Sequence, residues 1–102
     1  GLWAQVRLVE TGGELRAPGD SVHLSCRGSG FTFGNTGIWW YRQGPVRGLE
    51  WVSYIWTSSH RNYGPAVRGR AMASRDNSRS ESSLFLRDLR PQDSARYFCA
   101  VS

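Results

Sequence analysis

Hydrophobic and polar residues alternate with a period of two in several short segments of this chain. Such alternation predicts β-strands with one buried face, and the segments are 5–10, 22–27, 38–43, 49–55, 69–75, 82–89 and 97–99. In the third segment it directs Ile38 and Trp40 inward. Turn signals separate the segments, among them Pro18-Gly19-Asp20 and Asp76-Asn77-Ser78. Gly12-Gly13 predicts a kink or bulge in the first strand, which we expect at a sheet edge.

The two cysteines both lie in predicted strands, on the faces that the alternation turns inward. Val22, Leu24 and Cys26 share one inward face, and Tyr97 and Cys99 share another. Because the chain has no other thiol, a disulfide between the two cysteines is the obvious link. A disulfide would stabilise a thin core in an oxidising compartment, and free thiols in an intracellular protein are the alternative.

Length and composition limit the chain to one small domain. Its 102 residues are 39% hydrophobic and 13% aromatic, which is enough for one modest core. The net charge of +5 would suit a nucleic-acid binder, but all 13 basic residues are arginines spread singly along the chain. A nucleic-acid module needs clustered arginines with stacking aromatics, so we expect no nucleic-acid partner. No apolar run approaches the roughly 18 residues of a membrane helix, so we expect no direct membrane insertion.

Candidate chemistry is sparse. The glycine-rich segment 28–34 follows a strand, but its third glycine comes one place late for a dinucleotide-binding loop and β-formers occupy it. The two histidines, His23 and His60, lie in distant segments, so neither a metal site nor a catalytic dyad is readable. We therefore expect no enzyme activity, no cofactor and no metal.

Several motifs in order and spacing resemble an immunoglobulin variable domain of the heavy-chain type. Cys26, Trp40 and the run Asp93-x-Ala95-x-Tyr97-x-Cys99 match its Cys…Trp…Cys frame and its tyrosine corner. The further matching segments are Gly30-Phe31-Thr32-Phe33, Gly48-Leu49-Glu50-Trp51-Val52 and Ser74-Arg75-Asp76-Asn77-Ser78. The resemblance covers nearly everything from Gln5 to Ser102.

The resemblance implies an immunoglobulin V-type β-sandwich of two antiparallel sheets, with Trp40 packed on a Cys26–Cys99 disulfide and Tyr97 in the core. Residues 1–4 look like the tail of a secretory signal, and residues 5–102 like a variable domain lacking its last strand, as in an unrearranged V segment.

The same resemblance implies an ion pair between Arg70 and Asp93 at the base of the domain, with Arg42 and Glu50 close to it. The chain departs from the family where large apolar side chains are usual. It carries Ala71, Ala73 and Ser82 there. We expect an underfilled lower core, at about 0.8 kcal/mol for each lost CH₂ group.

The family's binding residues map onto three segments of this chain. The first hypervariable loop corresponds to Phe31, Thr32, Phe33, Gly34, Asn35, Thr36 and Gly37. The second corresponds to Trp56, Thr57, Ser58, Ser59, His60, Arg61 and Asn62. The surface that packs against a second variable domain corresponds to Tyr41, Gln43, Leu49 and Trp51. For Leu49 and Trp51, membership of the ordinary core is the alternative, although Val52 and Ile55 can already supply inward apolar contacts.

The implied function is antigen recognition by an immunoglobulin heavy-chain variable region in adaptive immunity. Its partners would be antigen and a second variable domain, either of light-chain type or a T-cell receptor partner. Its place would be extracellular, secreted or on the plasma membrane within a receptor. A T-cell receptor variable region of the delta type is the alternative, suggested by Trp40-Tyr41 and by the ending Cys99-Ala100-Val101-Ser102. Another immunoglobulin-like cell-surface binding module is more remote.

Overall fold

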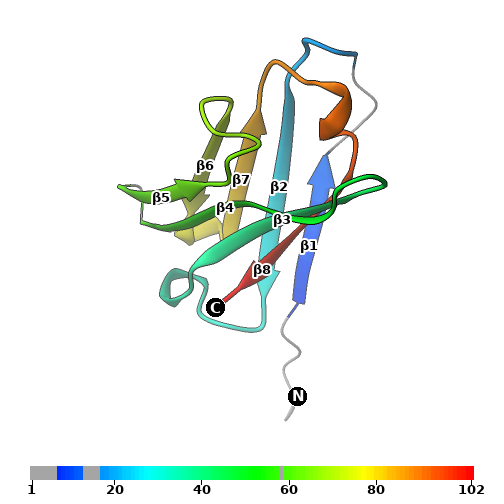
Figure 1. Ribbon diagram of the computed structural model, residues 1–102. Coiled ribbons are helices and arrows are strands. Elements are labelled where there is room, and N and C mark those ends of the chain that lie inside the picture. Colours follow the sequence, from blue (N-terminus) through cyan, green and yellow to red (C-terminus); the bar gives the residue numbers. More distant parts are fainter. Residues whose placement is uncertain (1–6, 13–16, 58) are drawn as a thin grey trace.

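The computed structural model describes residues 7–12, 17–57 and 59–102. Within them the chain forms strands and short 3₁₀ turns (Figure 1). The elements are β1 (Arg7–Gly12), β2 (Val22–Ser29), η1 (Phe33–Asn35), β3 (Ile38–Gly44), β4 (Gly48–Thr57), β5 (His60–Tyr63), β6 (Ala71–Asp76), η2 (Asn77–Arg79), β7 (Glu81–Leu86), η3 (Pro91–Asp93) and β8 (Arg96–Val101).

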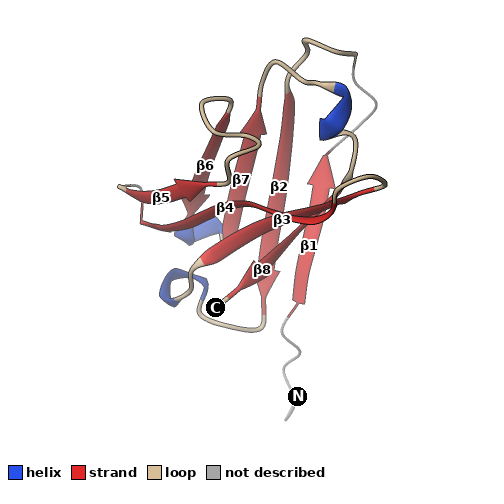
Figure 2. Cartoon of the chain, in the orientation of Figure 1, coloured by secondary structure: helices blue, strands red, loops and turns tan. Residues whose placement is uncertain are grey.

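The strands form two four-stranded antiparallel sheets that pack face to face. Their orders are β1-β2-β7-β6 and β5-β4-β3-β8, and Figure 2 shows the second sheet crossing in front of the first. This is the predicted all-β sandwich, and β1 lies at an edge as expected. At the end of β1, Gly12 has a φ of 102°, and a Cβ there would collide with the carbonyl oxygen of His23. Only glycine fits this conformation without strain, at the position where a kink or bulge is expected.

The alternation of hydrophobic residues correctly predicts which side chains face the core. Val22, Leu24 and Cys26 of β2 are buried, as are Ile38 and Trp40 of β3. These inward faces meet between the sheets because side chains along a strand point alternately to its two faces. The core is therefore a single layer between the two sheets.

A disulfide joins Cys26 of β2 to Cys99 of β8 and so connects the two sheets, as predicted. The Cα atoms of the two cysteines are 6.4 Å apart. Trp40 is fully buried and lies opposite Cys99 in the register between β3 and β8. The largest buried side chain therefore lies beside the covalent link between the sheets.

Most strand boundaries differ from the predicted ones by one or two residues, and three differences are informative. β6 starts at Ala71 instead of residue 69, because Gly69 has a φ of 84° and turns the chain just before it. β7 ends at Leu86 instead of residue 89, because Asp88 takes a left-handed conformation with a φ of 51°. Residues 60–63, expected within a loop, form strand β5 along the edge of β4.

Two of the three small residues of the lower core are buried, and polar groups at both are hydrogen-bonded. Ala73 and Ser82 have no exposed surface, whereas Ala71 is half-buried. The Ser82 hydroxyl donates to the carbonyl oxygen of Ser74 at 2.7 Å, and the hydroxyl of Tyr63 accepts the Ala73 N–H at 2.9 Å. The polar groups in this part of the interior are therefore hydrogen-bonded.

Candidate functional site

The strand register brings the two predicted loops to one end of the sandwich. Ile38, which follows the first loop, pairs with Ile55 of β4 and with Val101 of β8. The Ser102 N–H also donates to the carbonyl oxygen of Gly37 at 3.0 Å. Residues 31–37, 56–57, 59–60 and 101–102 therefore lie together, and we call this region the loop end (Figure 1).

The first loop exposes only part of its predicted contact residues. Thr32, Gly34 and Asn35 are exposed, and Phe31 and Thr36 are half-buried. Phe33 is only 3% exposed and belongs to the core, so its prediction as a contact residue is wrong. Its ring anchors the loop, because burying an aromatic side chain stabilises far more than leaving it in water.

Gly37 is also buried, which corrects its prediction at the loop tip. A Cβ at this position would lie 2.6 Å from the ring of Tyr54, so a side chain here would require that ring to move.

The second loop is shorter than predicted because strands extend into it. Trp56 and Thr57 end β4, and His60 to Asn62 lie in β5, while Ser58 is outside the described residues. The predicted residues that are described are all exposed, with Trp56 at 41%. Arg61 turns back over β6, where its Nη1 donates to the Met72 sulfur at 3.1 Å and to the Ala73 carbonyl at 3.2 Å. Its charged group therefore points away from the loop end.

Arg75 of β6 holds the two loops together, and sequence reasoning missed it. Its guanidinium donates to the carbonyl oxygens of Thr36 at 2.6 Å, Trp56 at 2.7 Å and Phe33 at 2.8 Å. The same group lies 5.2 Å from the centre of the Phe33 ring. We call this set of contacts the Arg75 clamp.

A signal for the clamp was present in the alternation. Ala71, Ala73 and Arg75 share one face of β6, so an arginine occupies a position that the pattern turns inward. Burial lowers the pKa of Arg75, and its partners in the clamp are neutral carbonyls. An arginine at an inward strand position indicates a carbonyl or carboxylate partner, because a buried guanidinium without one is very costly.

The outer face of β3 and β4 carries the residues predicted to meet a second domain. Tyr41 lies opposite Trp51, and Gln43 lies opposite Leu49. Leu49 is 62% exposed, which excludes it from the core, and Tyr41 and Trp51 are half-buried. These four residues form one patch, which is apolar except for Gln43. An exposed apolar patch is typical of an interaction surface.

Two aromatic residues that were not predicted extend this face. The ring of Tyr41 stacks on Phe98 of β8 with centroids 5.8 Å apart, and on Trp39 with centroids 6.3 Å apart. The register of β3 with β8 places Phe98 directly opposite Tyr41. Outward positions of adjacent strands line up in this way, so pairing β3 with β8 would have identified both residues.

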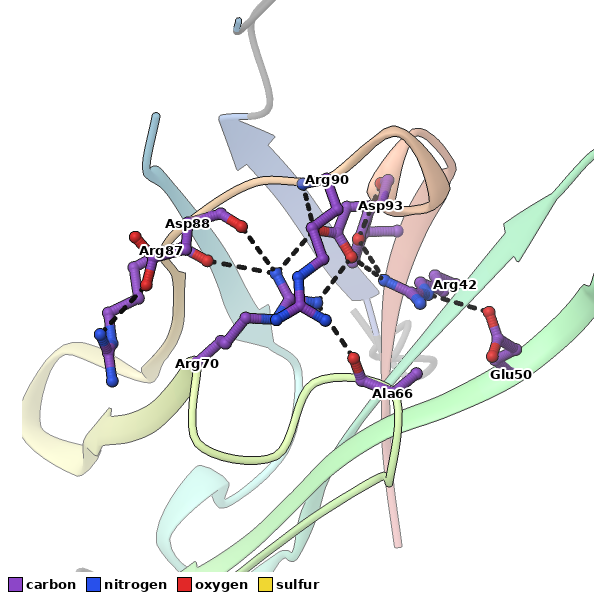
Figure 3. Close-up of polar contacts among 9 residues, drawn as sticks. Arg42, Glu50, Ala66, Arg70, Arg87, Asp88, Arg90 and Asp93 are labelled. Atoms are coloured by element: carbon purple, nitrogen blue, oxygen red, sulfur yellow. Dashed lines mark hydrogen bonds and ion pairs between the residues drawn. The ribbon is translucent and has the colours of Figure 1, made fainter. Parts of the chain in front are cut away.

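A buried charge cluster lies at the opposite end of the sandwich, near the start of β8 (Figure 3). Asp93 accepts hydrogen bonds from Arg70 Nη1 at 2.7 Å and from Arg42 Nη1 at 2.9 Å. Arg42 Nε bonds Glu50 at 3.1 Å, and the Tyr97 hydroxyl donates to the main-chain carbonyl of Asp93 at 2.9 Å. The predicted ion pair is therefore present, with both predicted neighbours around it.

The cluster keeps its carboxylate ionised although Asp93 is buried. Burial raises the pKa of Asp93, but hydrogen bonds from Arg70, the Arg90 N–H and Arg42 outweigh it and lower the pKa to about 2. Burial raises the pKa of Tyr97, and the hydrogen bond that its hydroxyl accepts from Arg42 acts in the opposite direction without cancelling the rise. These charged groups bond one another, so removing any one of them would leave a buried charge without its partner.

Metal ligands, histidines and membrane spans can be assessed in the part of the chain that the structure describes. No group of three or more His, Cys, Asp or Glu residues there could hold a metal ion. His23 and His60 lie on different sheets. Over the same residues, no helix is long and apolar enough to cross a bilayer.

Comparison with known families agrees with this architecture. The family model of the immunoglobulin V-set domain matches residues 15–102. V-set domains are typically non-enzymatic, extracellular or cell-surface binding modules, which pair with another immunoglobulin domain or bind ligands. The match covers most of the chain, and the two sheets, the disulfide between them and the buried Trp40 are those of the same fold. The chain therefore belongs to the immunoglobulin V-set domain family.

Proposed function

We propose that this chain is the variable region of an immunoglobulin heavy chain, which recognises antigen through its loop end while paired with a second variable domain. Exposed Thr32, Asn35, Trp56 and His60 support the first part, because the loop end offers adaptable polar groups beside a large aromatic side chain. The adaptive immune role and an extracellular location belong to this proposal.

The observation that carries the proposal is the outer face of β3 and β4. Leu49 is mostly exposed, and it lies beside the half-buried rings of Tyr41 and Trp51. Burying this patch against another domain would remove apolar area from water, and aromatic residues are enriched at such contacts. Pairing through this face would leave the loop end open to antigen.

A pairing experiment with two matched variants tests the proposal. Leu49→Arg and Phe85→Arg each place a charge at an exposed apolar residue, but Phe85 lies on β7 of the other sheet and is 42% exposed. We expect the unchanged chain and Phe85→Arg to form a heterodimer with a light-chain variable domain in sedimentation experiments. Leu49→Arg should weaken it at least about tenfold, because a buried charge would be left unpaired.

A T-cell receptor variable region of the delta type is the second candidate, favoured by Trp40-Tyr41 and by the residues Cys99 to Ser102. The same sedimentation experiment includes a T-cell receptor variable domain as a partner. Selective pairing with that partner would replace the heavy-chain assignment. If Leu49→Arg pairs as well as the unchanged chain does, the outer face of β3 and β4 is not the contact surface.

A further inference from the structure

An open cleft lies where β4 and β5 meet the aromatic outer face of their sheet. Its volume is about 550 Å³, within the range of small-molecule sites. The residues that line it are Trp39, Trp51, Tyr54, Arg61, Asn62, Tyr63 and Arg68. The set contains aromatic, amide and guanidinium groups and no carboxylate.

The register explains how these residues meet. Tyr54 of β4 pairs with Trp39 on one side and with Asn62 of β5 on the other, so the three share one face of the sheet. The rings of Trp39 and Tyr54 are 4.4 Å apart, centre to centre. They form a nearly continuous aromatic wall, and the amide of Asn62 lies at the end of the same row.

Arg68 supplies the positive charge of the cleft. Although Arg61 also lines it, the Arg61 guanidinium bonds Met72 and Ala73 of β6 in the other sheet. Arg68 is exposed, and its Nη2 makes a 3.3 Å bond to the carbonyl oxygen of Tyr63. A guanidinium has five N–H donors, so most of its donors remain for a ligand.

We propose that this cleft binds a small planar anion, an aromatic ring bearing a carboxylate or sulfonate. The ring stacks against Trp39 and Tyr54, and the anionic group accepts hydrogen bonds from Arg68 and from the Asn62 amide. A cation is disfavoured because Arg68 repels it, and a neutral ring gains stacking alone. The proposal names a ligand class for the binding module, and it rests on the proposed function only for that general role.

Equilibrium dialysis with two matched probes tests the proposal on the full chain. The probes are 2-naphthalenesulfonate and the neutral 2-naphthalenemethanol, which share the ring and differ in charge. We expect the chain to bind the sulfonate about twofold to fivefold more tightly, the range of an exposed charge pair. Arg68→Gln should abolish this preference, and Asn62→Asp should abolish it as well, because its carboxylate would neutralise Arg68.

Two control variants separate the cleft from the general positive charge of the chain. Arg79→Gln removes an exposed arginine in η2, and Gln92→Glu adds a carboxylate at an exposed residue of η3, outside the cleft. Both should keep the preference for the sulfonate. Equal binding of the two probes by the unchanged chain would overturn the proposal, as would a preference that survives in Arg68→Gln or disappears in both controls.

The failure of this proposal is distinguishable from the failure of the proposed function. The dialysis experiment needs no second domain, and Leu49, the residue that the pairing experiment changes, does not line the cleft. A chain that pairs with no variable domain but prefers the sulfonate would remove the heavy-chain assignment and support the cleft. A chain that pairs with a light-chain variable domain but binds both probes equally would support the heavy-chain assignment and remove the cleft proposal.

Discussion

Asp93 shows how one residue can determine the stability of a small domain at low pH. Its carboxylate is buried and accepts hydrogen bonds from two guanidinium groups and from the Arg90 N–H. Each of these interactions favours the charged form, and together they outweigh the cost of burial. Protonating Asp93 would leave Arg42 and Arg70 without their shared anion.

We therefore predict that the domain loses stability as the pH falls from about 4 to about 2. Folding lowers the pKa of Asp93 from 3.8 to about 2, so its contribution is complete above the unfolded pKa and disappears as the pH falls through the folded pKa. The contribution is about 2 kcal/mol. Urea unfolding across this pH range measures it.

Two variants make this prediction specific. Asp93→Asn should be less stable at neutral pH and should lose most of the acid dependence. Asp88→Asn removes an exposed carboxylate that pairs with Arg87 at the surface, so it should behave like the unchanged chain. The same acid dependence in Asp93→Asn and in the unchanged chain would show that other carboxylates control acid unfolding.

At the scale of elements, the position of both loops depends on β6. The guanidinium of Arg75 reaches from this strand to carbonyl oxygens at residues 33, 36 and 56. Since the strand is held in its sheet by pairing with β7, the clamp transfers that rigidity to the loop end.

We predict that Arg75→Gln loosens the loop end while the sheets stay intact. The variant loses charge-assisted hydrogen bonds that contribute about 2 kcal/mol, so the amides of Asn35 and Thr36 should exchange with solvent at least about tenfold faster. Hydrogen exchange measured residue by residue tests this, with Arg79→Gln as the control. Unchanged exchange at the two amides would contradict the clamp.

The sequence predicts some of these elements well and others poorly, for physical reasons. Alternation identifies inward residues such as Val22 and Ile38 because burial depends on strand phase alone. It fails for Phe33, whose burial depends on how a loop folds back. The Arg75 clamp is harder still, because its partners are main-chain groups and every residue carries a carbonyl.

At the scale of the whole molecule, the disulfide is a covalent cross-link between the two sheets. We predict that reducing it costs roughly 4 kcal/mol, because the link closes a loop of 73 residues in the unfolded chain. This is a large share of the stability of a small domain. Thermal unfolding with and without a reductant should show a large drop in melting temperature.

A double variant provides the control for this prediction. The chain with Cys26→Ala and Cys99→Ala should resemble the reduced chain, and a reductant should leave its melting temperature unchanged. If the reduced chain melts at the same temperature as the oxidised chain, packing around Trp40 alone holds the sheets together.

The Arg75 clamp has a consequence for how this chain can vary. Its guanidinium donates to main-chain oxygens at Thr36 and Trp56. Every residue carries such an oxygen, so these bonds do not depend on which side chains the loops carry. Other residues could therefore replace Asn35 and Ser59, whose side chains are exposed, without moving the loops. The outward side chains of the two loops can therefore change while one arginine of β6 keeps the loop main chain in place.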